Sequence, residues 1–388
     1  MKKCAFLLIL ILVLFIEVMA ETSEGQTIID EYISIYSEDI TKASNVNDAI
    51  VNIETIFPDF SAENLMEKSA SGGNIFDVRA LIEKIVSLLF LEMKSALKIM
   101  VFVLSLSVLS SYLSALPNAE NKEVSDVAFY ACYIIIAGVC SASFLEIITC
   151  GKDTIDTITL IARIIVPVVI ATLTASGAVI SASVFQPLLL GIIEIALTII
   201  ENIFFPAIIL FASLGIINCI SEKFNTEKML QFVGKSIKWG ISVLLTIFVG
   251  VAGLQGIASG SADGLSVKLA KYAASNLIPV VGGILSETVE TVMNCSVIIK
   301  NSVGIAGIIV MVGAMALPLI KISACLIIFR ISAAIIQPIT DGRVVKCVSG
   351  IADSVGLIFS VTLAVTVMFV IIMTIMLSAG NTAIMLGG

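Results

Sequence analysis

The sequence predicts an all-α, polytopic helical membrane protein of about seven to nine spans, with a small helical module at its N-terminus. Of its 388 residues, 58% are hydrophobic and only 13% are charged, whereas about a quarter of the residues of a soluble domain are charged. The mean hydropathy is +1.10. Apolar runs of about 20 residues, the length that crosses a bilayer, recur along the chain. An ordinary cytosolic enzyme is therefore excluded.

Residues 1–20 have the pattern of a secretory signal peptide. Lys2 and Lys3 form a basic start, residues 4–16 form a short apolar run, and Ala20 precedes the expected cleavage site. The alternative is a signal anchor that is not cleaved. In both cases the residues that follow are expected outside the cytoplasm.

Residues 21–95 are expected to form an acidic, helical, extracytoplasmic module. Its first part, 21–78, carries twelve acidic and two basic residues, a net charge of −10. Apolar residues recur at helical spacing in 28–40 and again in 78–89. The acidic surface is either a solvated face or a docking surface for a neighbouring protein, and the sequence leaves both open.

The rest of the chain divides into 96–157, with two predicted transmembrane helices, and two membrane repeats, 158–260 and 261–388. Residues 158–220 are apolar but interrupted by prolines, and predict three spans or two spans with a re-entrant piece. The lysine-rich loop 221–238 is expected in the cytoplasm, because cytoplasmic loops are enriched in Lys and Arg. The clearest predicted spans are 97–116, 127–149, 238–258, 303–320 and 355–378.

The repeat rests on proline spacing. Two pairs of prolines are each 39 residues apart, and the pairs are shifted by 112 residues. Short or broken helices at matched positions are typical of transporters built from inverted repeats. Residues 276–285 are too short to cross and are expected to form a re-entrant or interfacial segment. The residues predicted to act as hinges are Pro167, Pro206, Pro279, Gly282, Gly283 and Pro318.

Three charged residues lie within the apolar stretches and are the candidates for transport or helix contact. Glu194 and Glu201 are seven residues apart and therefore share a helix face. Arg163 is the nearest intramembrane partner for them. Charges at this depth cost roughly 2.5–3.5 kcal/mol on insertion scales, so they usually face a bundle interior, a cavity or a partner. An ion or proton relay, a contact to another subunit and a structural Arg–Glu pair all remain open.

Other patterns have simpler interpretations. Three further cations are expected to snorkel towards the membrane surface. A run of glycines at four-residue spacing predicts either a smooth helix face for close packing or a flexible loop. The eight cysteines have no metal-binding spacing and are expected to pack as small apolar residues. The cations are Lys300, Lys321 and Arg330, and the glycines are Gly256, Gly260 and Gly264.

Several kinds of site are excluded or unsupported. The chain has no histidine, which removes His-based catalysis and His-ligated zinc. Gly234-Lys235-Ser236 lacks the first glycine of a phosphate-binding loop, because position 229 is Met. No paired aspartates lie in facing spans, and no basic cluster suggests nucleic acid. We therefore predict no catalytic, cofactor-binding or metal site.

The central part of the chain resembles the stage III sporulation protein AE family. The resemblance is carried by Phe224-Asn225-Thr226-Glu227-Lys228, Lys238-Trp239-Gly240, Gly253-Leu254-Gln255-Gly256, Gly260-Ser261-Ala262-Asp263-Gly264, Lys271-Tyr272-Ala273 and Asn276-Leu277-Ile278-Pro279-Val280-Val281-Gly282-Gly283. The layout of signal peptide, acidic module and multi-span remainder fits the same family over essentially the whole chain.

This resemblance implies a membrane subunit of the export or feeding channel between mother cell and forespore, required for endospore development. It implies a location in the mother-cell membrane that faces the forespore. The implied partners are the lipid bilayer, ring-forming proteins, other membrane subunits and a separate ATPase. Two alternatives remain: an autonomous secondary transporter of a small metabolite or ion, which the repeat and the intramembrane glutamates favour, and a scaffold without a pathway.

Overall fold

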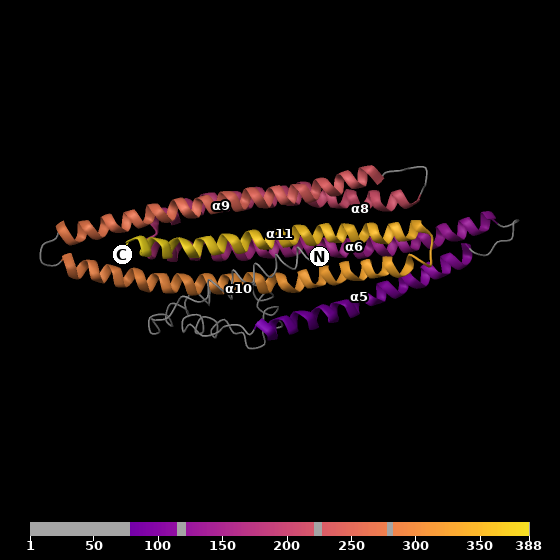
Figure 1. The fold of residues 1–388 in the computed structure, drawn as a ribbon, viewed down its shortest axis with the longest axis horizontal. Helices are drawn as coiled ribbons and strands as arrows, with labels where there is room; N and C mark the ends of the chain where they lie inside the picture. Colours follow the sequence, from indigo (N-terminus) through magenta and orange to yellow (C-terminus); the bar gives the residue numbers. More distant parts are fainter. Residues whose placement is uncertain (1–77, 115–121, 221–226, 278–281, 388) are drawn as a thin grey trace.

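The computed structural model describes residues 78–114, 122–220, 227–277 and 282–387, and these ranges are helical apart from two short connections (Figure 1). The predicted signal peptide and most of the acidic module lie outside the described residues. The elements are α5 (Val78–Ser114), α6 (Lys122–Ala175), α7 (Val179–Ile199), the π-helical turn η1 (Ile200–Phe204), α8 (Phe205–Ile220), α9 (Glu227–Leu277), α10 (Gly282–Ile336) and α11 (Gly342–Gly387).

The helices lie lengthwise in one elongated bundle. Helices α6, α9 and α10 contain 54, 51 and 55 residues, which corresponds to about 80 Å at 1.5 Å per residue. A hydrocarbon core is only about 30 Å thick, so each of these helices is much longer than one crossing requires. In Figure 1, α9 with α8 beside it forms one side of the bundle, α10 and α5 form the other, and α11 and α6 run between them.

Helix α11 is the centre of the bundle. It packs against α10, α9, α6 and α8, and most of its side chains between residues 344 and 379 are buried. A largely apolar helix with most of its side chains buried is typical of the core of a large helical protein. Substitutions in α11 that change the volume of a side chain are therefore expected to disturb the packing.

Glycines of three neighbouring helices allow this close packing. A Cβ atom at Gly151 of α6 would lie 2.8 Å from Cγ2 of Ile358, and one at Gly256 of α9 would lie 2.8 Å from Cγ2 of Ile375. On α10, a Cβ at Gly304 would overlap the side chain of Leu377. Between helices in lipid, association depends on van der Waals packing rather than on a hydrophobic driving force. Small residues at these positions are therefore what lets α11 fit.

The membrane prediction is confirmed, and the number of crossings stays a prediction. Five helices are long and apolar enough to cross a membrane by length and composition. They are Phe129–Ala175, Val179–Asn218, Glu227–Gly256, Cys295–Ile336 and Gly342–Ala379. The described part of the predicted span 97–116 lies on α5, which ends at Ser114 and is not one of the five.

Some predicted breaks are absent. Helix α6 runs through residues 150–157, so the predicted span 127–149 and the start of 158–220 form one helix. Likewise α10 joins the predicted span 303–320 to the apolar stretch after it. Within 158–220 the described chain turns once, at 176–178, so this region holds the end of α6 and one continuous helical rod, α7–η1–α8. Prolines do not break these helices, because a packed membrane bundle can satisfy the backbone groups that proline leaves free.

The internal repeat also stays a prediction, and the two copies differ in one respect. The turn at residues 176–178 would correspond to 288–290 after the shift of 112 residues, but α10 is helical there. The predicted boundaries after residues 157 and 260 fall inside α6 and α9.

We expect Gly256→Ala to lower the free energy of unfolding by about 1–3 kcal/mol, because overpacking a filled interface forces neighbouring side chains to shift. The matched control is Gly253→Ala on the same helix, where an added Cβ meets nothing within 4 Å. This control should be neutral or more stable by up to about 1 kcal/mol, the helix propensity gain of alanine. Thermal unfolding of both variants in detergent provides the measurement, and equal effects would contradict the packing argument.

Candidate functional site

Two of the three predicted charged residues form an ion pair between α6 and α7. Nη2 of Arg163 donates to Oε2 of Glu194 at 3.2 Å. Both side chains lie on the outside of the bundle, with 62% and 64% of their surface exposed. The pair therefore joins neighbouring helices without facing the bundle interior.

Glu201 lies in the π-helical turn that connects α7 to α8. The backbone N–H of Phe205 donates to the carbonyl of Ile200, five residues earlier, and Pro206 follows immediately. Proline has no N–H to offer to the carbonyl four residues before it, and a local widening of the helix accommodates that loss. Glu201 is exposed, and within the described ranges its carboxylate has no ion-pair partner.

The other predicted residues occupy varied places. Pro167 and Pro318 lie inside α6 and α10, neither of which is interrupted there. The three glycines of the four-residue repeat all lie on α9, where Gly256 approaches α11 closely. Gly282 and Gly283 begin α10, while Pro279 lies outside the described residues. The glycine repeat is therefore helical rather than a loop.

The most distinctive contact at one end of the bundle is made by Asp263, whose role the sequence did not reveal. This residue lies inside α9 and is completely buried. One oxygen of its carboxylate accepts from the N–H of Ile180 at 2.7 Å, and the other accepts from the N–H of Ser181 at 3.0 Å. A carboxylate suits a helix N-terminus, where N–H groups lack partners and the helix dipole is positive. Asp263 thus fastens α9 to the start of α7.

The turn before α7 explains why a distant cap is needed. Gly177 adopts φ 86°, a left-handed conformation that favours glycine. The N–H of Ala178 bonds to the carbonyl of Leu173, and that of Gly177 bonds to the carbonyl of Thr174, which is a Schellman ending for α6. Ala178 then occupies the N-cap position of α7 without a side-chain cap. The missing local capping residue at the start of α7 is the sequence signal from which an external acceptor could have been inferred.

The three cations expected to snorkel do not all behave that way. Lys300 is wholly buried, and its Nζ donates to the backbone carbonyl of Leu377 at 2.6 Å. Lys321 pairs with Glu146 of α6 at 2.8 Å. Arg330 pairs with Asp353 of α11. The prediction was wrong for Lys300, because packing against α11 places its amine inside the bundle.

At the opposite end of the bundle, Asp341 caps α11. Its Oδ1 accepts from the N–H of Arg343 at 2.9 Å, and Oδ2 accepts from Nη2 of Arg343 at 3.1 Å. Partial burial raises the pKa of Asp341, but the hydrogen bonds from Arg343 outweigh this and hold the pKa below its ordinary value. The guanidinium also lies over the ring of Phe129, 4.3 Å from its centroid. This corner therefore ties the start of α11 to α6.

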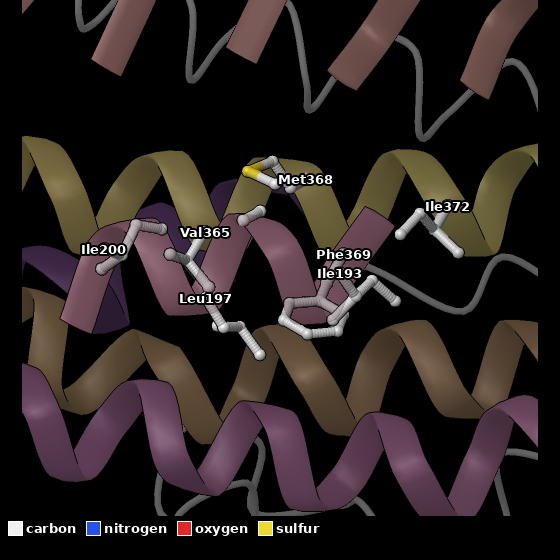
Figure 2. A pocket seen from close by; sticks show the side chains of 8 residues that line it. Ile193, Leu197, Ile200, Val365, Met368, Phe369 and Ile372 are labelled. Carbon is white, nitrogen blue, oxygen red and sulfur yellow. The ribbon is translucent and has the colours of Figure 1, made fainter. Parts of the chain in front are cut away.

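Figure 2 shows a small void between α7 and α11 that is lined only by apolar side chains. They include Leu197 of α7, Ile200 of η1, and Val365, Met368 and Phe369 of α11. Such a void offers no polar group to orient a ligand. Within the described ranges, no three His, Cys, Asp or Glu side chains are placed to hold a metal ion.

These features define a class of protein, an all-helical membrane protein whose intramembrane charges join helices or face outwards. Comparison with known proteins gives the family. The family model described as stage III sporulation protein AE matches residues 60–380. The stage III sporulation protein AE of Bacillus subtilis (strain 168) is 30% identical over 341 residues, which cover 88% of this chain and 85% of that protein. The chain belongs to the stage III sporulation protein AE family, as the sequence motifs predicted.

No solved structure matches this chain. Family membership supports a role in sporulation.

We expect Asp263→Ala to lower the free energy of unfolding by about 1–3 kcal/mol, because the buried N–H of Ser181 and the partly buried N–H of Ile180 lose their acceptor. Asp263→Asn retains one acceptor oxygen and should have an intermediate effect. Asp153→Ala removes an exposed carboxylate from α6 and serves as the control. Chemical unfolding of the purified variants in detergent gives the order. Equal stability of Asp263→Ala and the control would show that the cap contributes little.

We expect the free energy of unfolding of Lys300→Met to lie within about 1 kcal/mol of the wild-type value, because an apolar side chain of similar length often replaces a buried charge at no cost. Lys300→Glu should lose about 3–5 kcal/mol, since it sets a buried carboxylate against a carbonyl. Stability in detergent and heat-resistant spore titre are measured together. A stable Lys300→Met protein that fails to support spores would give the amine a role beyond packing.

Proposed function

We propose that this chain is a membrane subunit of the export or feeding channel that joins the mother cell to the forespore, and that endospore development requires it. The match to stage III sporulation protein AE over most of the chain supports the proposal most strongly. In this role the protein lies in the mother-cell membrane that faces the forespore. Its N-terminal module lies outside the cytoplasm, between the two membranes.

The proposed partners are ring-forming proteins, other membrane subunits and a separate ATPase. The chain contains no histidine, and the sequence around Gly234 lacks the first glycine of a nucleotide-binding loop. A subunit without its own catalytic centre, driven by an ATPase elsewhere in the complex, is consistent with both observations.

An autonomous transporter is a poorer fit to the packing. Transporters bind their substrate near the bilayer midplane, where broken helices supply polar groups. Here α11 fills the middle of the described bundle, and the void beside it is apolar. The charged residues on α6 and α7 face outwards instead. This arrangement favours a subunit that makes contacts with other proteins over a chain with its own pathway.

The test is complementation in an endospore-forming host whose own copy of the gene is deleted. We expect the wild-type chain to restore heat-resistant spores and assembly of the membrane complex. A second strain carries Glu194→Gln with Glu201→Gln. Because these residues lie on the outer surface, we expect this double variant to reach the membrane and to impair assembly of the complex, and with it spore formation.

Other outcomes separate the alternatives. A wild-type chain that reaches the membrane but restores no spores would contradict the proposed function. Lost spore development with an intact complex would point to a transport path at the two glutamates. Solute uptake by the purified chain alone in liposomes would favour the autonomous transporter. Normal spores from the double variant would favour a scaffold that does not use these carboxylates.

A further inference from the structure

A line of charged residues follows the seam between α6 and the rod formed by α7, η1 and α8. Arg163 pairs with Glu194 at one end of this line. At the other end, Nζ of Lys152 lies over the ring of Phe205, 5.4 Å from its centroid. The two helical segments are antiparallel, because the tight turn at 176–178 joins them.

These two contacts fix the register of everything between them. Arg163 is eleven positions after Lys152, and Phe205 is eleven positions after Glu194. Asp156 lies seven residues from Arg163, and Glu201 lies seven residues from Glu194. The two carboxylates therefore occupy the same level of the seam on facing helices. Both are exposed, and within the described ranges neither has an ion-pair partner.

One side of the seam lies on a candidate membrane span. The candidate span Val179–Asn218 has 40 residues, whereas about 20 cross the hydrocarbon. Any stretch of about 20 residues within this span contains at least one of the two glutamates. A stretch that begins at or before residue 194 contains Glu194, and one that begins later contains Glu201. Most placements contain Glu201. An exposed carboxylate at that depth is costly unless a protein group covers it.

The charge and the symmetry of this face indicate what covers it. Along the seam, two basic residues (Lys152 and Arg163) stand against three acidic ones (Asp156, Glu194 and Glu201), a net charge of −1. A second copy docked by a two-fold axis would place the same patch against itself, which adds a second net negative charge instead of neutralising the first. Lipid tails offer no counter-charge. The complementary occupant is a helix of another protein with a basic residue.

We propose that the seam centred on Asp156 and Glu201 docks a transmembrane helix of another membrane protein, which places a lysine or arginine against these two carboxylates. The apolar side chains around them fit the same purpose, since Ile195 and Ile203 are 63% and 57% exposed. A partner helix would cover these side chains while its cation pairs with the carboxylates. This inference rests on the proposed function, because it names the chemistry of one partner within that complex.

The experiment is photocrosslinking in intact sporulating cells. A photoreactive phenylalanine analogue replaces Ile203, an exposed residue in the same π-helical turn as Glu201. The matched control replaces Ile247, which is 60% exposed on α9. Crosslinked peptides are identified by mass spectrometry and normalised to the amount of the chain in the membrane. We expect an adduct from position 203, not from 247, with a transmembrane segment of a different protein that contains a Lys or Arg.

Charge variants then test the mechanism. Glu201→Gln combined with Asp156→Asn should lower the adduct by at least about tenfold, because a cation desolvated in the interface loses its partners. Glu227→Gln, which removes an exposed carboxylate at the far end of α9, should leave the adduct unchanged. Glu201→Lys should abolish it, and reversing the partner's cation to Glu should restore it.

Three results would overturn the proposal: an adduct only with a second copy of this chain, an adduct only with lipid, or a protein adduct that the charge variants do not alter. Spore titre is measured in the same strains. If the wild-type chain supports spores while one of these results is obtained, the docking proposal fails and the proposed function stands. If the wild-type chain supports no spores, the proposed function fails, whatever the crosslinking result.

Discussion

The close packing of α11 against its neighbours is the constraint on which the rest of the bundle depends. Glycines on α6, α9 and α10 leave grooves in which Ile358, Ile375 and Leu377 lie. Lipid tails compete with protein side chains for apolar contact, so only a close fit favours helix against helix. The polar contacts are placed around this core: Asp263 fastens α7 at one end, and Asp341 with Arg343 fastens the start of α11 at the other.

The charged side chains discussed above have three different roles. Some join helices of the same chain on the outer surface, as Lys321 does with Glu146. Some satisfy backbone groups inside, as Asp263 and Lys300 do. The third kind, at Asp156 and Glu201, faces outwards without a counter-charge in the described ranges. The proposed contact with another protein would supply a counter-charge for these two carboxylates.

Composition and apolar run length were enough to predict an all-helical membrane protein, because the bilayer admits few alternatives. The motif around Asp263 was enough to suggest the family. Helix breaks were harder to predict, since proline and short polar stretches interrupt an isolated helix but not one held in a bundle. Thus α6 continues through Lys152 and Asp156, and α10 continues through Pro318. The role of Asp263 depends on a contact across 83 positions, which periodicity does not reveal.

The central position of α11 also bears on how the protein is made. This helix follows all its described neighbours in the chain, so α6, α9 and α10 enter the membrane before the helix that fills their grooves exists. Until then the glycine-lined surfaces at Gly151, Gly256 and Gly304 face lipid or one another. A chain interrupted before residue 342 loses the middle of the bundle rather than an edge. Such a chain would keep the glycine surfaces of three helices and lack the helix that covers them.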